Sequence, residues 1–163
     1  IVINFRSYAT DCGDPLLCGV TVSDTRLQQG QGMHGNFSRA DTMNFMAAIG
    51  PDFKTGYVDT LPASNADVGM TIAQILGLRS TANGGLMGRV LSEAIPNGIT
   101  PKAAVTSRLI SKPSDNGLRT VVQYQRVLGQ RYFDVAGFPG RTLGLDPIDT
   151  ADKSDRKHAN ATR

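Results

Sequence analysis

The chain contains no tryptophan, and only two of its 163 residues are cysteine and two are histidine. It has no apolar run near the roughly 18 residues that a membrane-crossing helix needs, so we expect no membrane span. Two cysteines cannot form a structural zinc site alone, because such sites use four ligands. The net charge of +3 is a small basic excess, and aromatic residues make up only 6%. These values argue against a nucleic-acid duplex as partner.

The first residues, IVINF, are apolar and β-branched and lack an initiator methionine. A new polypeptide seldom starts inside such a strand-like run, so we interpret the sequence as a piece of a longer chain. Ile-Val starts also occur in activated trypsin-like proteases. Nucleophilic serine chemistry needs an oriented Ser–His–carboxylate set, and the sequence has no GDSGG-like segment. We therefore exclude the protease interpretation.

Cys12 and Cys18 flank the segment GDPLL, whose Gly, Asp and Pro are turn residues. A turn there would bring the two thiols within bonding distance, which predicts a small disulfide loop. Disulfides persist in oxidising compartments, so we expect a periplasmic or secreted protein. Two free thiols in a cytosolic protein are the alternative.

The period of the apolar residues changes along the chain. In the segment SNADVGMTIAQILGL (64–78), Val68, Ile72, Ile75 and Leu76 fall on one face at helical spacing behind a capping Ser64 or Asn65, which predicts a helix with an apolar face. LMGRVLSEAI (86–95) predicts a second, shorter helix. TMNFMAAI (42–49) ends at Gly-Pro and favours a strand. The pattern then becomes β-like, which predicts an antiparallel meander from the segments 103–110, 118–127 and 130–138.

These patterns predict three parts. Residues 1–100 would form the main part, residues 101–145 the small antiparallel meander that completes it, and residues 146–163 a polar, mobile tail.

His34 lies in the glycine-rich segment GQGMHG, directly before the polar stretch that leads to residues 42–49. A lone histidine is more often structural than a ligand. Neighbouring glycines, however, let an imidazole project without competing side chains. Asp24, Asp41, Ser38 and Thr42 lie nearby in the sequence, and for these we expect surface, capping or loop hydrogen-bonding roles.

Four segments in order carry a resemblance to a known family: GMHG, MNFMAAIGPDFKTG, SNADVGMTIAQILGL and NGGLMGRVL, within residues 30–91. Together they resemble the C-terminal part of the alkaline phosphatase superfamily, and within it the nucleotide pyrophosphatase/phosphodiesterase branch. The resemblance implies an α/β fold, the C-terminal portion of a three-layer α/β/α sandwich with the antiparallel meander as an appendage. Residues 1–100 would then be the C-terminal part of the catalytic α/β domain.

The resemblance also implies a function. The chain would be the C-terminal fragment of a metal-dependent hydrolase of phosphoric esters, and His34 would supply one ligand to a centre of two ions, usually zinc and alternatively another divalent metal. The nucleophile and the other ligands would lie upstream, so the missing N-terminal segment would be a partner and the fragment alone would be inactive. An inactive structural or interaction module of the same fold, or a sulfatase or phosphonate hydrolase, are the alternatives.

Overall fold

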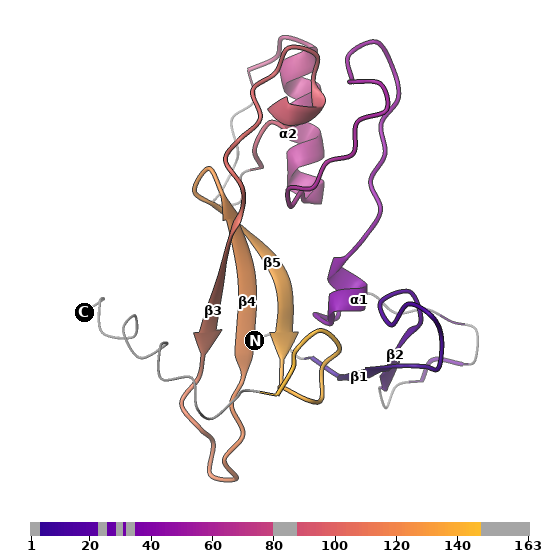
Figure 1. The fold of residues 1–163 in the computed structure, drawn as a ribbon, viewed down its shortest axis with the longest axis vertical. Helices are drawn as coiled ribbons and strands as arrows, with labels where there is room; N and C mark the ends of the chain where they lie inside the picture. Colours follow the sequence, from indigo (N-terminus) through magenta and orange to yellow (C-terminus); the bar gives the residue numbers. More distant parts are fainter. Residues whose placement is uncertain (1–3, 23–25, 29–30, 32–34, 80–87, 148–163) are drawn as a thin grey trace. The chain divides into compact units, whose positions relative to one another are not determined.

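The computed structural model describes residues 4–22, 26–28, 31, 35–79 and 88–147 (Figure 1). His34, His158, most of the predicted tail and the first three residues lie outside these ranges. The chain divides into two compact units. Unit 1 comprises residues 1–42, 110–121 and 135–163, and unit 2 comprises residues 43–109 and 122–134. Each unit is described by itself below.

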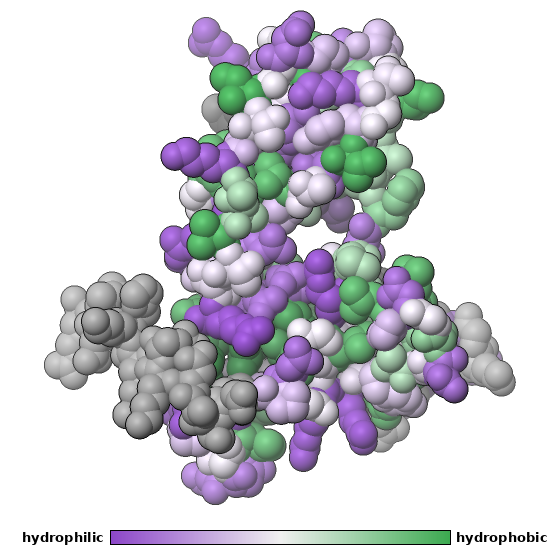
Figure 2. All heavy atoms as spheres, in the orientation of Figure 1, coloured by the Kyte–Doolittle hydropathy of each residue, from purple (hydrophilic) through white to green (hydrophobic). Residues whose placement is uncertain are grey.

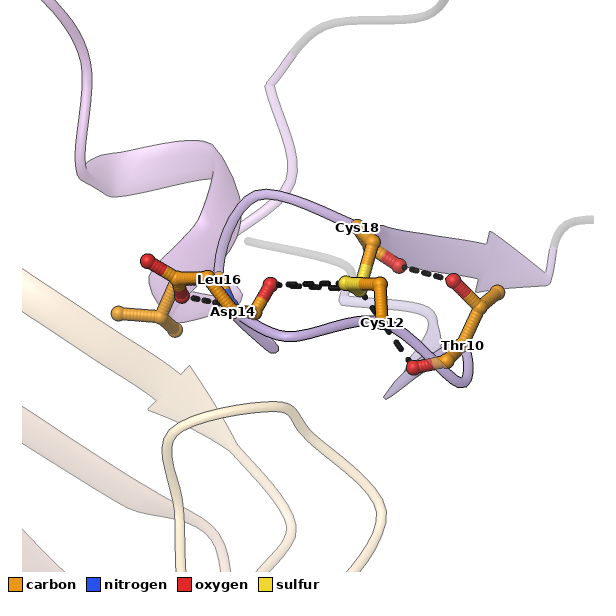
Figure 3. Close-up of a disulfide and its surroundings, with 5 residues drawn as sticks. All are labelled: Thr10, Cys12, Asp14, Leu16 and Cys18. Atoms are coloured by element: carbon orange, nitrogen blue, oxygen red, sulfur yellow. Dashed lines mark hydrogen bonds between the residues drawn. A yellow bond between two sulfur atoms is a disulfide. The ribbon is translucent and has the colours of Figure 1, made fainter.

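Unit 1 contains a short antiparallel hairpin of β1 (Arg6–Ala9) and β2 (Gly19–Val22), in which Arg6 pairs with Val22 and Ala9 with Gly19. The loop at its tip is closed by the predicted disulfide between Cys12 and Cys18 (Figure 3). The unit also contains the single-turn helix α1 (Arg39–Thr42). Its hydrophobic core consists of Val121, Val135 and Leu145, with Ile110 packed against them.

The meander predicted for the C-terminal half is confirmed. Strands β3 (Val105–Ile110), β4 (Val121–Val127) and β5 (Gln130–Gly137) form one antiparallel sheet in the order β3-β4-β5 (Figure 1). The loop between β3 and β4 is closed by Ser111 N, which donates to Thr120 O at 2.9 Å, and by Gly117 N, which donates to Ser114 O at 2.8 Å. This is the turn that its Pro, Asp, Asn and Gly residues predict.

Unit 2 contains α2 (Asn65–Ile75) and the 3₁₀ turn η1 (Ser92–Ala94). The cap of α2 is as predicted: Ser64 is the N-cap, and its backbone N–H donates to Asp67 Oδ2 at 2.8 Å. The buried face differs from the prediction. Asp67 and Thr71 are the buried residues of α2, whereas Val68 and Ile72 are exposed.

The prediction of a three-layer α/β/α sandwich is wrong for the described residues. They form five short strands in two small antiparallel sheets, with two short helices. A sandwich of this kind needs parallel strands joined by crossover helices that cover both sheet faces. Neither sheet has such a crossover.

Two local predictions, the strand at 42–49 and the helix at 86–95, are also wrong. The expected strand at 42–49 is absent: Thr42 ends α1, and residues 43–49 follow an irregular path. The apolar composition of that run predicts burial between strands, but no described strand pairs with it. In the expected helix at 86–95, residues 88–91 are not helical. The N–H groups of Arg89 and Leu91 donate to side chains of α2 instead of to helical carbonyls.

Candidate functional site

The segment that directly follows His34 is held in place by asparagine side chains. Asn36 donates to Thr21 Oγ1 at 3.0 Å and to Asp41 Oδ2 at 3.1 Å. Its Oδ1 accepts the backbone N–H of Phe5 at 3.4 Å. One side chain therefore joins β2, α1 and the N-terminal segment, and its amide is occupied in internal hydrogen bonds.

Asn4 holds the same segment through a second set of hydrogen bonds. Its Oδ1 accepts the N–H of Phe37 at 3.1 Å, and its Nδ2 donates to the carbonyl of Ala136 in β5. Ala136 N donates to Phe37 O at 2.9 Å. Ser38, almost completely buried, donates to the Asp41 carboxylate. Ser38 and Asp41 thus have the hydrogen-bonding roles that the sequence predicts, and Thr42 donates to the carbonyl of Arg39.

Unit 2 contains a buried group of charged and polar side chains, here called the Arg89 cluster: Asp59, Asp67, Arg89, Glu93 and Tyr132. At its centre Arg89 and Glu93 form a two-point ion pair, with Nη2–Oε1 at 2.5 Å and Nη1–Oε2 at 2.8 Å. The Glu93 side chain is 0% exposed and that of Arg89 is 5% exposed. Arg89 Nη2 also donates to the Pro62 carbonyl at 3.1 Å.

The cluster connects the segments that carry the family resemblance. Asp67 Oδ1 accepts the backbone N–H of Arg89 at 2.7 Å, and Thr71 Oγ1 accepts that of Leu91 at 3.0 Å. Lys54, from the segment GPDFK, donates through Nζ to the Glu93 carbonyl at 2.7 Å and through its backbone N–H to the Ala94 carbonyl at 2.9 Å. Three segments distant in sequence thus meet in one network.

Close packing of residues 88–91 on α2 requires a glycine at position 88. A Cβ built there would overlap the carbonyl of Ala66 and crowd the backbone nitrogen of Asp67. The absence of a side chain therefore lets the backbone of residues 88–91 approach α2 closely enough for the two hydrogen bonds to form.

The ion pair sets the electrostatics of the cluster. Burial alone would raise the pKa of Glu93, but the hydrogen bonds and charge of Arg89 outweigh it and lower that pKa. The opposite holds for Asp59, whose pKa is raised by burial and by the charge of Glu93. Burial and the charge of Asp67 raise the pKa of Tyr132 to about 12. The ring of Tyr132 also lies under Arg89, at 5.8 Å from ring centroid to guanidinium carbon.

The Arg89 cluster uses its polar groups to hold the backbone in place, so few of them remain to bind a ligand. The Arg89 guanidinium is already bonded to Glu93 and Pro62, so it is not available to a phosphate group. Sequence reasoning missed the cluster, although Arg89 and Glu93 stand four residues apart with opposite charges. Residues of opposite charge at that spacing usually form an ion pair on the surface of a helix. Here the pair is buried, and Glu93 lies in the 3₁₀ turn η1.

An open groove of about 660 Å³ lies elsewhere in unit 2, lined mainly by Pro51, Asp52, Gln74, Ile75 and Val90. Asp52 is its one ionisable lining residue. A phosphate ester would need convergent cationic groups or metal ions, which this lining does not supply.

Metal ligands were the main prediction for the site. Within the described ranges no three His, Cys, Asp or Glu side chains come together as a group that could hold a metal ion. The predicted ligand His34 and the nearby Asp24 both lie outside these ranges. The described residues therefore do not by themselves fit a metal centre, and no catalytic step can be built through one. Over the same residues, no helix has the length and apolar character to cross a membrane.

Comparisons with protein-family models, with curated proteins and with solved structures found no match.

Proposed function

We propose that this chain is part of a metal-dependent hydrolase of phosphoric esters, of the phosphodiesterase or nucleotide pyrophosphatase type, to which His34 supplies one metal ligand. The support is the ordered set of four sequence segments and one structural observation. Three of these segments are joined in unit 2 by the hydrogen bonds of Lys54, Asp67 and Arg89. Segments that act together in one fold are expected to pack together.

The segment after His34 also supports the proposal. A ligand histidine needs a backbone held at a fixed position, since supporting hydrogen bonds orient the first ligands of a metal. Asn36 and Asn4 hold residues 36 and 37 through hydrogen bonds to several elements. A single imidazole does not bind zinc tightly, so the proposal requires further ligands beyond the described residues.

A secreted or periplasmic location is part of the proposal. The Cys12–Cys18 disulfide supports it, because such bonds persist in oxidising compartments.

The test uses the full-length polypeptide and a matched pair of histidine variants. His34→Ala should reduce the bound zinc, measured by elemental mass spectrometry, and should lower hydrolysis of chromogenic phosphate mono- and diesters by orders of magnitude. His158→Ala, which changes the chain's other histidine, should alter neither. Equal metal content and rate in both variants would refute the assignment of His34.

A non-catalytic interaction module is the second candidate, and exposed apolar side chains favour it. Phe45 is 91% exposed and Ile49 is 99% exposed, and Val68, Ile72 and Leu76 of α2 are also exposed. Figure 2 shows apolar residues, in green, at the surface among hydrophilic ones. Exposed apolar side chains mark an interaction site where they form one patch, and this candidate requires such a patch. Full-length protein that binds no metal and hydrolyses no phosphate or sulfate ester would favour this candidate.

A further inference from the structure

The turn between β4 and β5 fixes which side chains face each other across these strands. Two residues, Leu128 and Gly129, separate the strands, and both have positive φ, 49° and 84°. Positive φ at both positions is typical of a type I′ turn, which pairs the residues on either side of it. The turn therefore pairs Val127 with Gln130, and the next pair along the two strands is Arg126 with Arg131.

Side-chain contacts agree with this register. Gln123 donates to Asp134, which the same register places opposite it. Arg126 Nη2 lies 3.4 Å from the hydroxyl oxygen of Tyr124. The guanidinium carbons of Arg126 and Arg131 both lie 5.5 Å from the ring centroid of Tyr124. Two arginines therefore flank one tyrosine ring on the same face of the sheet.

This face carries positive charge without a compensating acid from its own strands. Arg126 and Arg131 are both exposed, and the ring between them is 6% exposed. The one acidic residue of the three strands, Asp134, bonds Gln123 on the opposite face. Like charges directly opposite each other destabilise a sheet. A negatively charged partner would relieve the repulsion between Arg126 and Arg131. The face should therefore bind acidic partners in preference to neutral or basic ones.

Apolar side chains lie beside the arginines. Arg108 Nε donates to Gln123 Oε1 at 2.7 Å, so Arg108 lies on the opposite face together with Gln123. Side chains alternate along a strand, so Val105 and Leu109 lie on the face of Tyr124. Val105 is 62% exposed, Leu109 55% and Phe133 61%. We call this surface the arginine face, and it consists of Val105, Leu109, Tyr124, Arg126, Arg131 and Phe133.

We propose that the arginine face docks an amphipathic helix of a protein partner that carries two carboxylates one turn apart beside its apolar stripe. The charge of the face requires an acidic partner. Directly opposite residues of a sheet have Cβ atoms about 4.5–5.5 Å apart. Helical residues at i and i+4 are separated by about 5–6 Å, so two such carboxylates match the arginine pair. Each carboxylate can accept two hydrogen bonds from a guanidinium.

The apolar residues decide between classes of partner. Val105 and Leu109 are aliphatic, and burying them favours a helix with an apolar stripe. Single-stranded nucleic acid needs a series of exposed aromatic rings, whereas Phe133 is the one aromatic ring of this face with large exposure. The proposal is independent of the hydrolase function.

The test is a binding titration of the full chain with a synthetic helical peptide, followed by fluorescence anisotropy. The peptide has a leucine stripe and two glutamates at i and i+4, and a matched peptide has glutamines in their place. We expect the glutamate peptide to bind at least about tenfold more tightly, and the preference to weaken as salt screens the charges. In R126Q/R131Q the preference should disappear, while the exposed control R119Q should keep it.

A charge-reversal variant tests the proposal independently, in case the loss of preference in R126Q/R131Q comes from a change in the sheet. R126E/R131E should prefer a peptide with lysines at the same two positions, with circular dichroism confirming an unchanged fold. Equal binding of both peptides to the native chain, or no measurable binding, would overturn the proposal. Tighter binding of an oligothymidine probe, lost in R126Q/R131Q, would also overturn it and assign the face to nucleic acid.

Discussion

Unit 1 and unit 2 both bring together segments far apart in sequence, but they do so with different chemistry. In unit 1 the distant connections come from the uncharged amides of Asn4 and Asn36, and only one of them, the bond from Asn36 to Asp41, has a carboxylate as acceptor. In unit 2 they are ionic and buried, with Arg89 and Glu93 at the centre. Neutral hydrogen bonds depend little on pH, whereas a buried ion pair is lost when either partner changes its charge. The two units should therefore respond to different perturbations.

The largest effect should come from breaking the ion pair of unit 2. Glu93→Ala leaves the Arg89 guanidinium buried without its carboxylate, which should cost about 3–5 kcal/mol. Hydrogen exchange measured by mass spectrometry should show faster exchange in residues 62–79 and 88–94, with little change in the β1–β2 hairpin. The double variant Arg89→Met/Glu93→Leu removes both charges and should recover most of the loss. Uniformly faster exchange in both units would show that they do not respond separately.

The second effect, in unit 1, depends on redox state. The Cys12–Cys18 disulfide closes a short ring at the hairpin tip, where Thr10 N and Oγ1 donate to the Cys18 carbonyl at 3.2 and 3.1 Å (Figure 3). Removing a ring of this size, by Cys12→Ser/Cys18→Ser, should cost about 2 kcal/mol. A reducing agent should lower the melting temperature of the native chain and leave that of the variant unchanged. A melting temperature insensitive to reduction would contradict this role.

A third change would make unit 1 sensitive to pH. Asn36→Asp keeps an acceptor for Phe5 N, but it places a carboxylate beside Asp41 and removes the amide donor. Repulsion and the lost hydrogen bond should cost about 1–2 kcal/mol at neutral pH. Repulsion raises the pKa of the introduced carboxylate in the folded state, so its penalty should shrink as the pH falls. Asn36→Ala, which adds no charge, is the control whose loss should not depend on pH in this way.

The features that local patterns predicted are those set by neighbouring residues. Ser64 and Asp67 mark the start of α2 because a cap needs only the first turn of the helix. The three strands of the meander follow from alternating, β-branched segments separated by turn residues, and the disulfide follows from two cysteines around a Gly-Asp-Pro turn. None of these requires a contact distant in sequence.

The features that local patterns did not predict depend on distant contacts. The helical pattern of 64–78 put Val68 and Ile72 on one apolar face, but the side chains of Asp67 and Thr71 are the buried ones. They face inward because they accept the N–H groups of residues 89 and 91. The same two bonds explain why residues 88–91 are not helical. The predicted sandwich rested on a family resemblance, and the described strands have none of its parallel pairing. His34 remains a prediction from sequence.

The smallest expected effect concerns Asp59 in unit 2, whose pKa is shifted in the opposite direction to that of Glu93. Asp59 accepts the N–H of Leu61 at 3.0 Å, and its pKa is raised by burial and by the charge of Glu93. A folded-state pKa above the unfolded value means that protonated Asp59 stabilises the fold and that this stabilisation is lost as the pH rises through the folded pKa. At neutral pH the ionised group therefore opposes folding slightly.

Asp59→Asn keeps the acceptor for Leu61 and removes the charge, so it should raise the melting temperature slightly at neutral pH and lose this advantage in acid. Glu93 has the opposite sign: its pKa is lowered, so its contribution is present above the unfolded pKa and is lost as the pH falls through the folded value. Thermal unfolding of the native chain and the Asp59→Asn variant across the acid range would measure both trends. A variant less stable than the native chain at neutral pH would show that ionised Asp59 stabilises unit 2 through a contact stronger than its repulsion from Glu93.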